Sequence, residues 1–160
     1  MKTLVLIPFI MLGTCASAQE LVYGLGGVRY SSDPSQSDTQ VSLEYRTAPF
    51  HQRRFTNFRW GGAVVGHTRG DLWAGLGIVV QKELDENWFV EGSFMPGIYH
   101  GSSQETKLGN AIEFRSLLAV GYKVSDKTSI SLAIDHRSNG GLSDHNPGVN
   151  GLSLRLHRKY

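Results

Sequence analysis

Two residues near the end of the chain, His136 and Ser138, form a pair of side chains that could hydrolyse an ester. A serine hydroxyl is a weak nucleophile until an adjacent base takes its proton, and a histidine imidazole is a suitable base. On a β-strand, a residue and its second neighbour share a face and lie about 6.5 Å apart at Cα. The imidazole can therefore reach the hydroxyl, and the pattern indicates a serine–histidine hydrolase.

A third residue, Asn150, completes a candidate catalytic set. If Ile134 pairs with Leu152 in a β-hairpin, the same register places Asn150 opposite His136. Directly opposed residues bring their Cβ atoms to about 5 Å. The asparagine oxygen could then accept the second imidazole N–H and fix the tautomer, as the Asn of Cys-His-Asn proteases does. We therefore expect Asn150 to act with His136 and Ser138.

Simpler interpretations of the polar residues in this region also stand. A His-x-Ser pattern is common, and taken singly each residue is more often a polar strand end, because geometry rather than sequence identifies a nucleophile and its base. Asp144 could supply a carboxylate, but Asp is an ordinary turn residue. His145 lacks the ligand spacing of a zinc site, so we expect neither a metal nor another cofactor.

The elements that must position these residues are short strands. After the first 18 residues, apolar side chains recur with a period of two rather than 3.6, as in Ile130-Leu132-Ile134. Clusters of Gly, Asp, Asn, Ser and Pro lie between the periodic segments and indicate turns. The pattern predicts an all-β fold of eight strands near residues 20–31, 40–48, 56–66, 71–82, 87–97, 109–124, 127–138 and 149–160.

The two faces of the late strands distinguish a membrane barrel from a soluble one. One face carries Leu, Ile, Val and Phe, and the other carries Glu113, Arg115, Asp135, Arg137 and Arg155. An apolar exterior around a polar interior is typical of transmembrane barrels. Charges inside the barrel need partners, so we expect them to form a network. The sequence thus predicts an eight-stranded antiparallel transmembrane β-barrel.

The first 18 residues have the features of a cleaved signal peptide. A basic start, an apolar run over residues 4–12 and the small residues Ala16-Ser17-Ala18 precede Gln19. Residues 19–160 are therefore expected to form the barrel in a bacterial outer membrane. The single cysteine, Cys15, falls in the removed segment, which excludes thiol chemistry from the mature chain. The net charge of +2 gives no argument for a nucleic-acid partner.

The barrel topology sets the level of the candidate site in the membrane. With both termini in the periplasm, the long connections at 32–39, 98–108 and 139–148 are extracellular, as in other outer-membrane barrels. His136 and Ser138 share the outward parity of Ile130 and lie near the outer end of their strand. We therefore expect them on the lipid-facing surface, at the level where ester bonds join acyl chains to the head groups of the outer leaflet.

This segment resembles the signature of a known enzyme family, the lipid A 3-O-deacylases (PagL). The similarity covers His136-Arg137-Ser138-Asn139-Gly140-Gly141-Leu142 and Asn146-Pro147-Gly148, and a similar run extends from Leu108 to Ser116. The resemblance implies an outer-membrane esterase that removes the 3-hydroxyacyl chain at position 3 of lipid A without a cofactor. It further implies that His136 is the base and Ser138 the nucleophile, with Asn139 and the backbone N–H groups of Gly140 and Gly141 stabilising the oxyanion.

The sequence departs from the family pattern at two positions. The family places a Glu where this chain has Asn150, and some members carry an acidic residue where this chain has Ser116. A neutral amide stabilises an imidazolium less than a carboxylate does. A family member that binds lipid A without cleaving it is therefore an alternative function.

Two further alternatives are a structural or adhesive outer-membrane barrel and a soluble periplasmic barrel. A barrel without enzymatic activity gives no reason to align His136, Ser138 and Asn150 on one face. For the membrane barrel, the expected partners are lipopolysaccharide and the surrounding outer-membrane lipids, and the sequence is also compatible with a homodimer.

Overall fold

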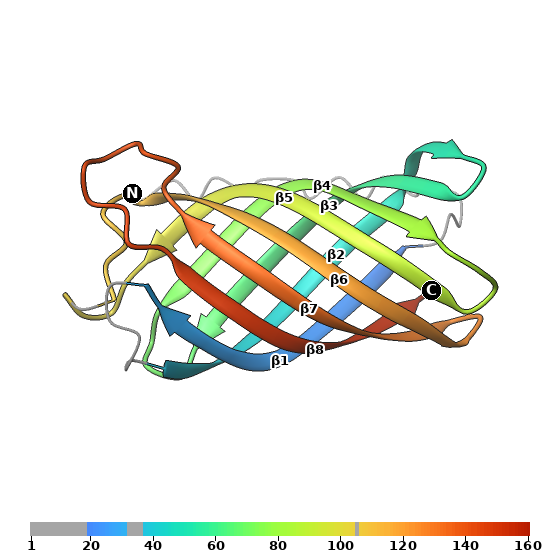
Figure 1. The fold of residues 1–160 in the computed structure, drawn as a ribbon, viewed down its shortest axis with the longest axis horizontal. Coiled ribbons are helices and arrows are strands. Elements are labelled where there is room, and N and C mark those ends of the chain that lie inside the picture. The colour runs from blue at the N-terminus through green and yellow to red at the C-terminus, as the bar shows by residue number, and fades with distance from the viewer. Residues whose placement is uncertain (1–18, 32–36, 105) are drawn as a thin grey trace, which may run out of the picture.

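The computed structural model describes residues 19–31, 37–104 and 106–160, which form a closed antiparallel β-barrel (Figure 1). Each strand pairs with its neighbours in sequence, and the last strand closes the ring on the first. The predicted fold and strand order are confirmed, whereas the predicted signal peptide, 1–18, lies outside the described residues. The strands are β1 (Glu20–Tyr30), β2 (Ser37–Arg53), β3 (Thr56–His67), β4 (Leu72–Glu83), β5 (Trp88–His100), β6 (Ile112–Ser125), β7 (Thr128–Ser138) and β8 (Val149–Lys159).

The strand boundaries differ from the prediction mainly at β2, β5 and β6. Strand β2 covers 17 residues rather than the nine predicted from 40 to 48. It begins three residues earlier, at Ser37, and register shifts near Pro49 let it continue beyond the turn signals to Arg53. Strand β6 begins at Ile112 rather than at 109. Gly109 has a φ of 88°, which is incompatible with an extended strand. Because β5 also continues to His100 rather than ending at 97, the connection between them covers residues 101–111 instead of 98–108.

The outer surface of the barrel is apolar along the strands. Leu132 and Ile134 on β7 and Leu152 and Leu154 on β8 each expose more than half of their surface. These are the residues that the period-two pattern assigned to one face, as the pleat of a strand requires. Burying such a surface requires a non-aqueous surrounding, and the lipid-facing band of a membrane barrel provides it.

The interior of the barrel holds the predicted network of paired charges, except that the buried carboxylate of Glu113 has no hydrogen-bond partner among the described residues. The guanidinium of Arg46, which is fully buried, lies 2.6 to 3.1 Å from carboxylate oxygens of Glu20, Glu44 and Glu91. Arg155 lies 2.9 Å from Glu44 and 2.6 Å from Glu91. These pairs link β2 to β5 and β8 across the barrel and fill its middle. Because an unpaired buried charge is very costly, breaking any one of them would destabilise the fold.

A second interior layer lies toward the end of the barrel where β1 ends and β8 begins. It is an apolar cluster of buried side chains that includes Tyr30, Trp73, Met95, Tyr99 and Val149. The long connection between β7 and β8 projects from this end, and the C-terminus lies at the opposite end (Figure 1). Within the described ranges, no helix is long and apolar enough to cross a membrane.

Candidate active site

The candidate site is built on the last three residue pairs of the β6–β7 ladder. His136 lies opposite Ser116, and Ser138 lies opposite Phe114. The imidazole is exposed on the outer surface and Ser138 is half-buried. The structure therefore brings His136 and Ser138 to one outward face near the end of β7, as the parity of the sequence predicted.

Arg137, between these two residues, fixes the strand from the inside of the barrel. Its fully buried guanidinium donates a hydrogen bond to Gln40 Oε1 at 2.8 Å and lies 3.1 Å from His67 Nε2. Its Nε atom lies 3.3 Å from Asp135 Oδ2. Buried hydrogen-bonded charges allow little movement, so this cluster holds the backbone that carries His136 and Ser138.

His136 and Asn150 are joined across the β7–β8 hairpin. They occupy opposite positions in the ladder, in the register that the sequence predicted. The imidazole Nδ1 lies 2.8 Å from Asn150 Oδ1. An amide oxygen can only accept a hydrogen bond, so in this arrangement Nδ1 carries the proton. The other ring nitrogen, Nε2, is then left with its lone pair and can act as a base.

Gly148 packs against the other edge of the same imidazole. Its φ is 70°, a conformation that favours glycine. A Cβ atom added at this position would lie 2.9 Å from His136 Cε1 and 3.4 Å from Nε2. The backbone before β8 therefore restricts the ring on one edge while Asn150 holds the other edge, and both contacts depend on the course of this one segment.

Ser138 lies opposite one of two stacked phenylalanine side chains. The ring of Phe114, its opposite residue, stacks on Phe94 with ring centroids 5.8 Å apart. The same ring lies close under Gly140, where an added Cβ would approach it to 3.1 Å. Between the described residues Ser138 and His136 themselves, no side-chain hydrogen bond is present. The two side chains share a face and a strand end, but the contact needed for proton transfer is not formed in this structure.

The loop after Ser138 is held together by Asn139. Its buried side-chain amide donates to the carbonyl oxygens of Leu108 and His145 at 3.0 and 2.8 Å, and to Ser143 Oγ at 2.8 Å. Its Oδ1 accepts a hydrogen bond from Gly141 N at 2.9 Å. The backbone N–H of Gly140 donates no hydrogen bond within the described part of the chain. The loop thus uses the Asn139 amide internally and leaves a backbone donor next to Ser138.

Two connected hollows run from the site along the outer surface. The first, of about 380 Å³, is lined by Ser116, Leu118, Ile134, His136 and Asn150, among others. The second, of about 390 Å³, shares Leu118 and Ile134 with the first and continues over Val120, Leu132 and Leu152. The path begins with polar groups at the imidazole and becomes apolar along β6, β7 and β8, away from the loop end of the barrel.

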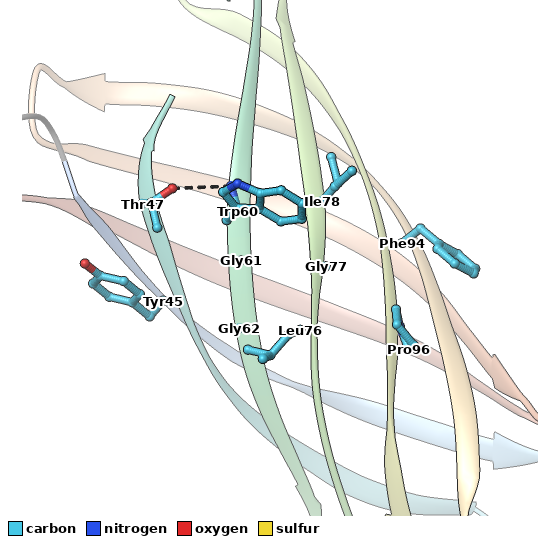
Figure 2. Close-up of a pocket in the computed structure, with 10 residues that line it drawn as sticks. All are labelled: Tyr45, Thr47, Trp60, Gly61, Gly62, Leu76, Gly77, Ile78, Phe94 and Pro96. Atoms are coloured by element: carbon cyan, nitrogen blue, oxygen red, sulfur yellow. Dashed lines mark hydrogen bonds between the residues drawn. The ribbon is translucent and has the colours of Figure 1, made fainter. Parts of the chain in front are cut away.

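A separate groove of about 600 Å³ lies on the outer surface of β2 to β5. Figure 2 shows Tyr45 on one side and Phe94 and Pro96 on the other, with Trp60, Gly61, Gly62 and Gly77 on the strands between them. None of the predicted site residues lines it. Phe94 lines this groove and also stacks on Phe114, the residue opposite Ser138.

Sequence reasoning missed one residue that the structure adds to this region. Ser31, immediately after β1, accepts a hydrogen bond at its Oγ from Asn150 Nδ2 at 3.1 Å. The two residues are far apart in sequence, and no motif marks Ser31. Only the register between β1 and β8, which places Arg29 opposite Asn150, could have drawn attention to it. The alternative carboxylate, Asp144, is exposed, and no hydrogen bond or ion pair connects it to His136 among the described residues.

Comparisons with known proteins agree with this architecture. The family model of the lipid A 3-O-deacylase (PagL) family matches residues 39–159. A comparison with curated proteins gave no significant match.

Solved structures of outer-membrane barrels share the fold. The crystal structure of the outer membrane enzyme PagL is 18% identical, with a TM-score of 0.69 over 87% of this chain and 98% of that chain. Neisserial surface protein A is 10% identical, with a TM-score of 0.58 over 89% of this chain and 96% of that one. Ail of Yersinia pestis is 10% identical, with a TM-score of 0.57 over 91% of this chain and 100% of that one.

Proposed function

Because this chain belongs to the lipid A 3-O-deacylase (PagL) family, we propose that it hydrolyses the ester that links a 3-hydroxyacyl chain to position 3 of lipid A. The reaction takes place in the outer leaflet of the outer membrane. Ser138 is the nucleophile, His136 the general base and Asn150 the residue that orients the imidazole. A lipid substrate cannot leave the bilayer, so a site on the lipid-facing surface suits it.

The observation that carries this proposal is the contact between His136 and Asn150. Their 2.8 Å separation at Nδ1 and Oδ1 supports the tautomer in which Nε2 is free to accept a proton. Ser138 lies two residues further along the same outward face of β7, and the proposal requires its hydroxyl to meet that nitrogen when substrate is bound. An oriented base beside a hydroxyl is the arrangement that nucleophilic catalysis needs.

The proposed reaction proceeds in two steps. Ser138 Oγ attacks the ester carbonyl carbon while His136 Nε2 takes the hydroxyl proton. The tetrahedral intermediate then collapses, the bond from carbon to the sugar oxygen breaks, and the imidazolium returns the proton to that oxygen. Water, activated by the same nitrogen, attacks the acyl-serine and releases the 3-hydroxy fatty acid and the free serine. No cofactor is needed to balance these steps.

The negative oxygen of the intermediate needs a donor, and the proposal assigns it to the loop after Ser138. The backbone N–H of Gly140 is the candidate, because Gly141 N–H already donates to Asn139 Oδ1. Asn139 contributes by holding the loop in place through its buried amide. A backbone donor fixed before the reaction needs no reorganisation when the charge develops, which is why such donors accelerate acyl transfer.

The two hollows that extend from the imidazole along β6, β7 and β8 support the choice of an acyl substrate. Their polar start at Ser116, His136 and Asn150 suits an ester, and their apolar continuation suits a hydrocarbon chain. A chain lying there would run from the site into the hydrophobic band of the membrane.

The second candidate function is a barrel that binds lipid A without cleaving it. Two observations favour it: Ser138 and His136 are not hydrogen-bonded to each other, and the orienting residue is neutral. Catalytic hydrogen bonds often tighten only in the complex with substrate, so the first observation does not contradict hydrolysis. Catalysis and binding alone are separated by measuring product.

The test is mass spectrometry of lipid A from cells that express the parent protein, Ser138→Ala or the control Ser125→Ala. Ser125 is an exposed serine at the other end of the barrel. We expect loss of one 3-hydroxyacyl chain from lipid A with the parent and the control, and intact lipid A with Ser138→Ala. Intact lipid A with all three folded proteins would exclude the deacylase and leave the binding function.

A further inference from the structure

Ser31 contacts the segment that surrounds the imidazole through two separate hydrogen bonds. Its Oγ accepts from Asn150 Nδ2 at 3.1 Å. Its backbone N–H donates to the carbonyl oxygen of Gly148 at 3.1 Å. Gly148 and Asn150 are two residues of this segment that lie against the His136 imidazole, Gly148 beside Cε1 and Asn150 at Nδ1. Ser31 therefore attaches the end of β1 to both supports of the ring.

We propose that Ser31 is a positioning residue, which holds the Asn150 amide with its oxygen toward His136 Nδ1. An asparagine amide presents an acceptor on one side and donors on the other. In the structure the Ser31 hydroxyl accepts from Nδ2, which leaves the oxygen for the imidazole. A hydroxyl can also donate, so the proposal is specifically that Ser31 acts here as an acceptor. This inference rests on the proposed function, because the orientation matters only if His136 acts as a base.

The orientation of the amide determines the protonation of the imidazole. With Oδ1 toward the ring, Nδ1 is the protonated nitrogen and Nε2 is available to accept the serine proton. With the amide rotated by 180°, an N–H would point at Nδ1, which must then be the acceptor, and the proton moves to Nε2. The wrong tautomer cannot take a proton from Ser138, which is the cause given for the large rate loss in the Asp→Asn variants of serine proteases. A carboxylate does not have this ambiguity because its two oxygens are equivalent.

The two contacts of Ser31 can be separated by mutation. Replacement by alanine removes the hydroxyl but keeps the backbone N–H that donates to Gly148. Ser31 is exposed and lies just after the end of β1, so its hydroxyl contributes little to packing. Any effect of Ser31→Ala on the reaction is therefore expected to arise at Asn150 rather than through the fold.

The experiment compares Ser31→Ala in two backgrounds, the parent and Asn150→Asp. Loss of one hydrogen bond predicts that kcat falls about two- to tenfold in the parent, with little change in KM. In the Asn150→Asp background the same substitution should change kcat less than about twofold, because rotation of a carboxylate restores an acceptor. Ser37→Ala, an exposed serine at the same end of the barrel, is the matched control. Equal losses in both backgrounds would show a merely structural role and overturn the proposal.

A second measurement reports the tautomer without relying on catalysis. Nitrogen-15 NMR of His136 in detergent micelles should show the proton on Nδ1 in the parent and a mixture of tautomers in Ser31→Ala. Ser31→Asp should keep the parent tautomer, because a carboxylate at position 31 can only accept from the amide. An unchanged tautomer in Ser31→Ala would overturn the proposal. If the parent released no fatty acid, the proposed function would fail, and the NMR result would still decide whether Ser31 orients Asn150.

Discussion

His136 and Asn150 lie opposite each other in the β7–β8 ladder and are hydrogen-bonded on the outer surface of the barrel, with 2.8 Å between Nδ1 and Oδ1. The pair thus brings an oriented imidazole to the lipid-facing side of the protein instead of its interior. The partner is a neutral amide, so it fixes the tautomer of the ring without adding a negative charge. Removal of the amide and its replacement by a carboxylate should therefore have opposite effects.

The first prediction concerns Asn150. Asn150→Ala should lower kcat at least about tenfold, with an upper limit near the ~10⁴-fold loss that a wrong tautomer causes in serine proteases. Asn150→Glu should preserve or raise activity, because a carboxylate accepts the same hydrogen bond and stabilises the imidazolium, although desolvation would raise the pKa of the new carboxyl. Lipid A deacylation in matched detergent across pH measures both variants. Full activity of Asn150→Ala would show that Asn150 does not orient the imidazole. The site would then work either as a Ser-His dyad or with Asp144 as the orienting residue.

The second prediction concerns the nucleophile and the base. Ser138→Ala and His136→Ala should each reduce release of 3-hydroxy fatty acid by about 10³-fold or more, and the double variant should be about as impaired as either one, because the two act as a unit. All three should still fold, since neither side chain is part of the buried interior. Folding is checked by the heat-dependent mobility shift of barrels on gels. Additive losses in the double variant would contradict a joint role.

The third prediction uses the contact between Gly148 and the imidazole. Gly148→Ala should lower kcat about tenfold or more, because its Cβ would lie 2.9 Å from His136 Cε1 and small displacements of catalytic groups are costly. Gly70→Ala is the control. The φ of Gly70 is 99°, which is also unfavourable for alanine, but a Cβ added there would lie no closer than 3.4 Å to any neighbour, the nearest being Ser102 Cβ. Kinetics of both purified variants separate ring displacement from backbone strain. Equal activity losses would attribute the effect to strain alone.

The fourth prediction tests the orientation of the barrel faces. Leu132→Arg should destabilise the barrel in a bilayer by roughly 2–4 kcal/mol, and Val124→Arg, near the end of β6, by about 0–1 kcal/mol. Both side chains are exposed on the outer surface, so the difference reports depth in the membrane. Urea-dependent folding into lipid vesicles measures it. Equal effects at the two positions would place the hydrophobic band elsewhere on the barrel.

The fifth prediction concerns the pH range in which Asp71 supports the β5–β6 connection. Burial alone would raise the pKa of the Asp71 carboxyl, but hydrogen bonds from Tyr30, Ser102 and Thr106 outweigh it and lower the pKa from 3.8 to about 2. A depressed pKa stabilises the folded protein above pH 3.8, and that contribution is lost as the pH falls through about 2. The amide proton of Ser102 should therefore titrate near pH 2 in an NMR experiment in micelles. A midpoint near 3.8 would show that these hydrogen bonds do not persist in solution.

The strand pattern could be predicted from the sequence because the pleat imposes a period of two on a surface that faces lipid on one side and charges on the other. The same parity placed His136, Ser138 and Asn150 on one face. The pairing of Ile134 with Leu152 set the register of the last hairpin, since β7 and β8 are adjacent in sequence and a one-residue slip would turn every side chain to the wrong face.

Local pattern could not place contacts that depend on loop conformation. Nothing in the period-two alternation predicts the bulges near Pro49 that lengthen β2, because bulges interrupt the repeat on which the prediction depends. The role of Asn139 inside its loop also follows from the course of the backbone between β7 and β8. Its amide is directed at carbonyl groups that only the folded loop brings together.

The sequence by itself determined the barrel, the outward face of its candidate site and the pairing of His136 with Asn150, because these follow from alternation and from a hairpin between neighbouring strands. Only the tertiary structure decided that Ser31 meets Asn150. That contact requires β1 to close on β8 in one register, with Glu20 opposite Lys159. The stagger accumulated around the whole ring sets this register, and it depends on all eight strand pairs together rather than on any segment of the chain.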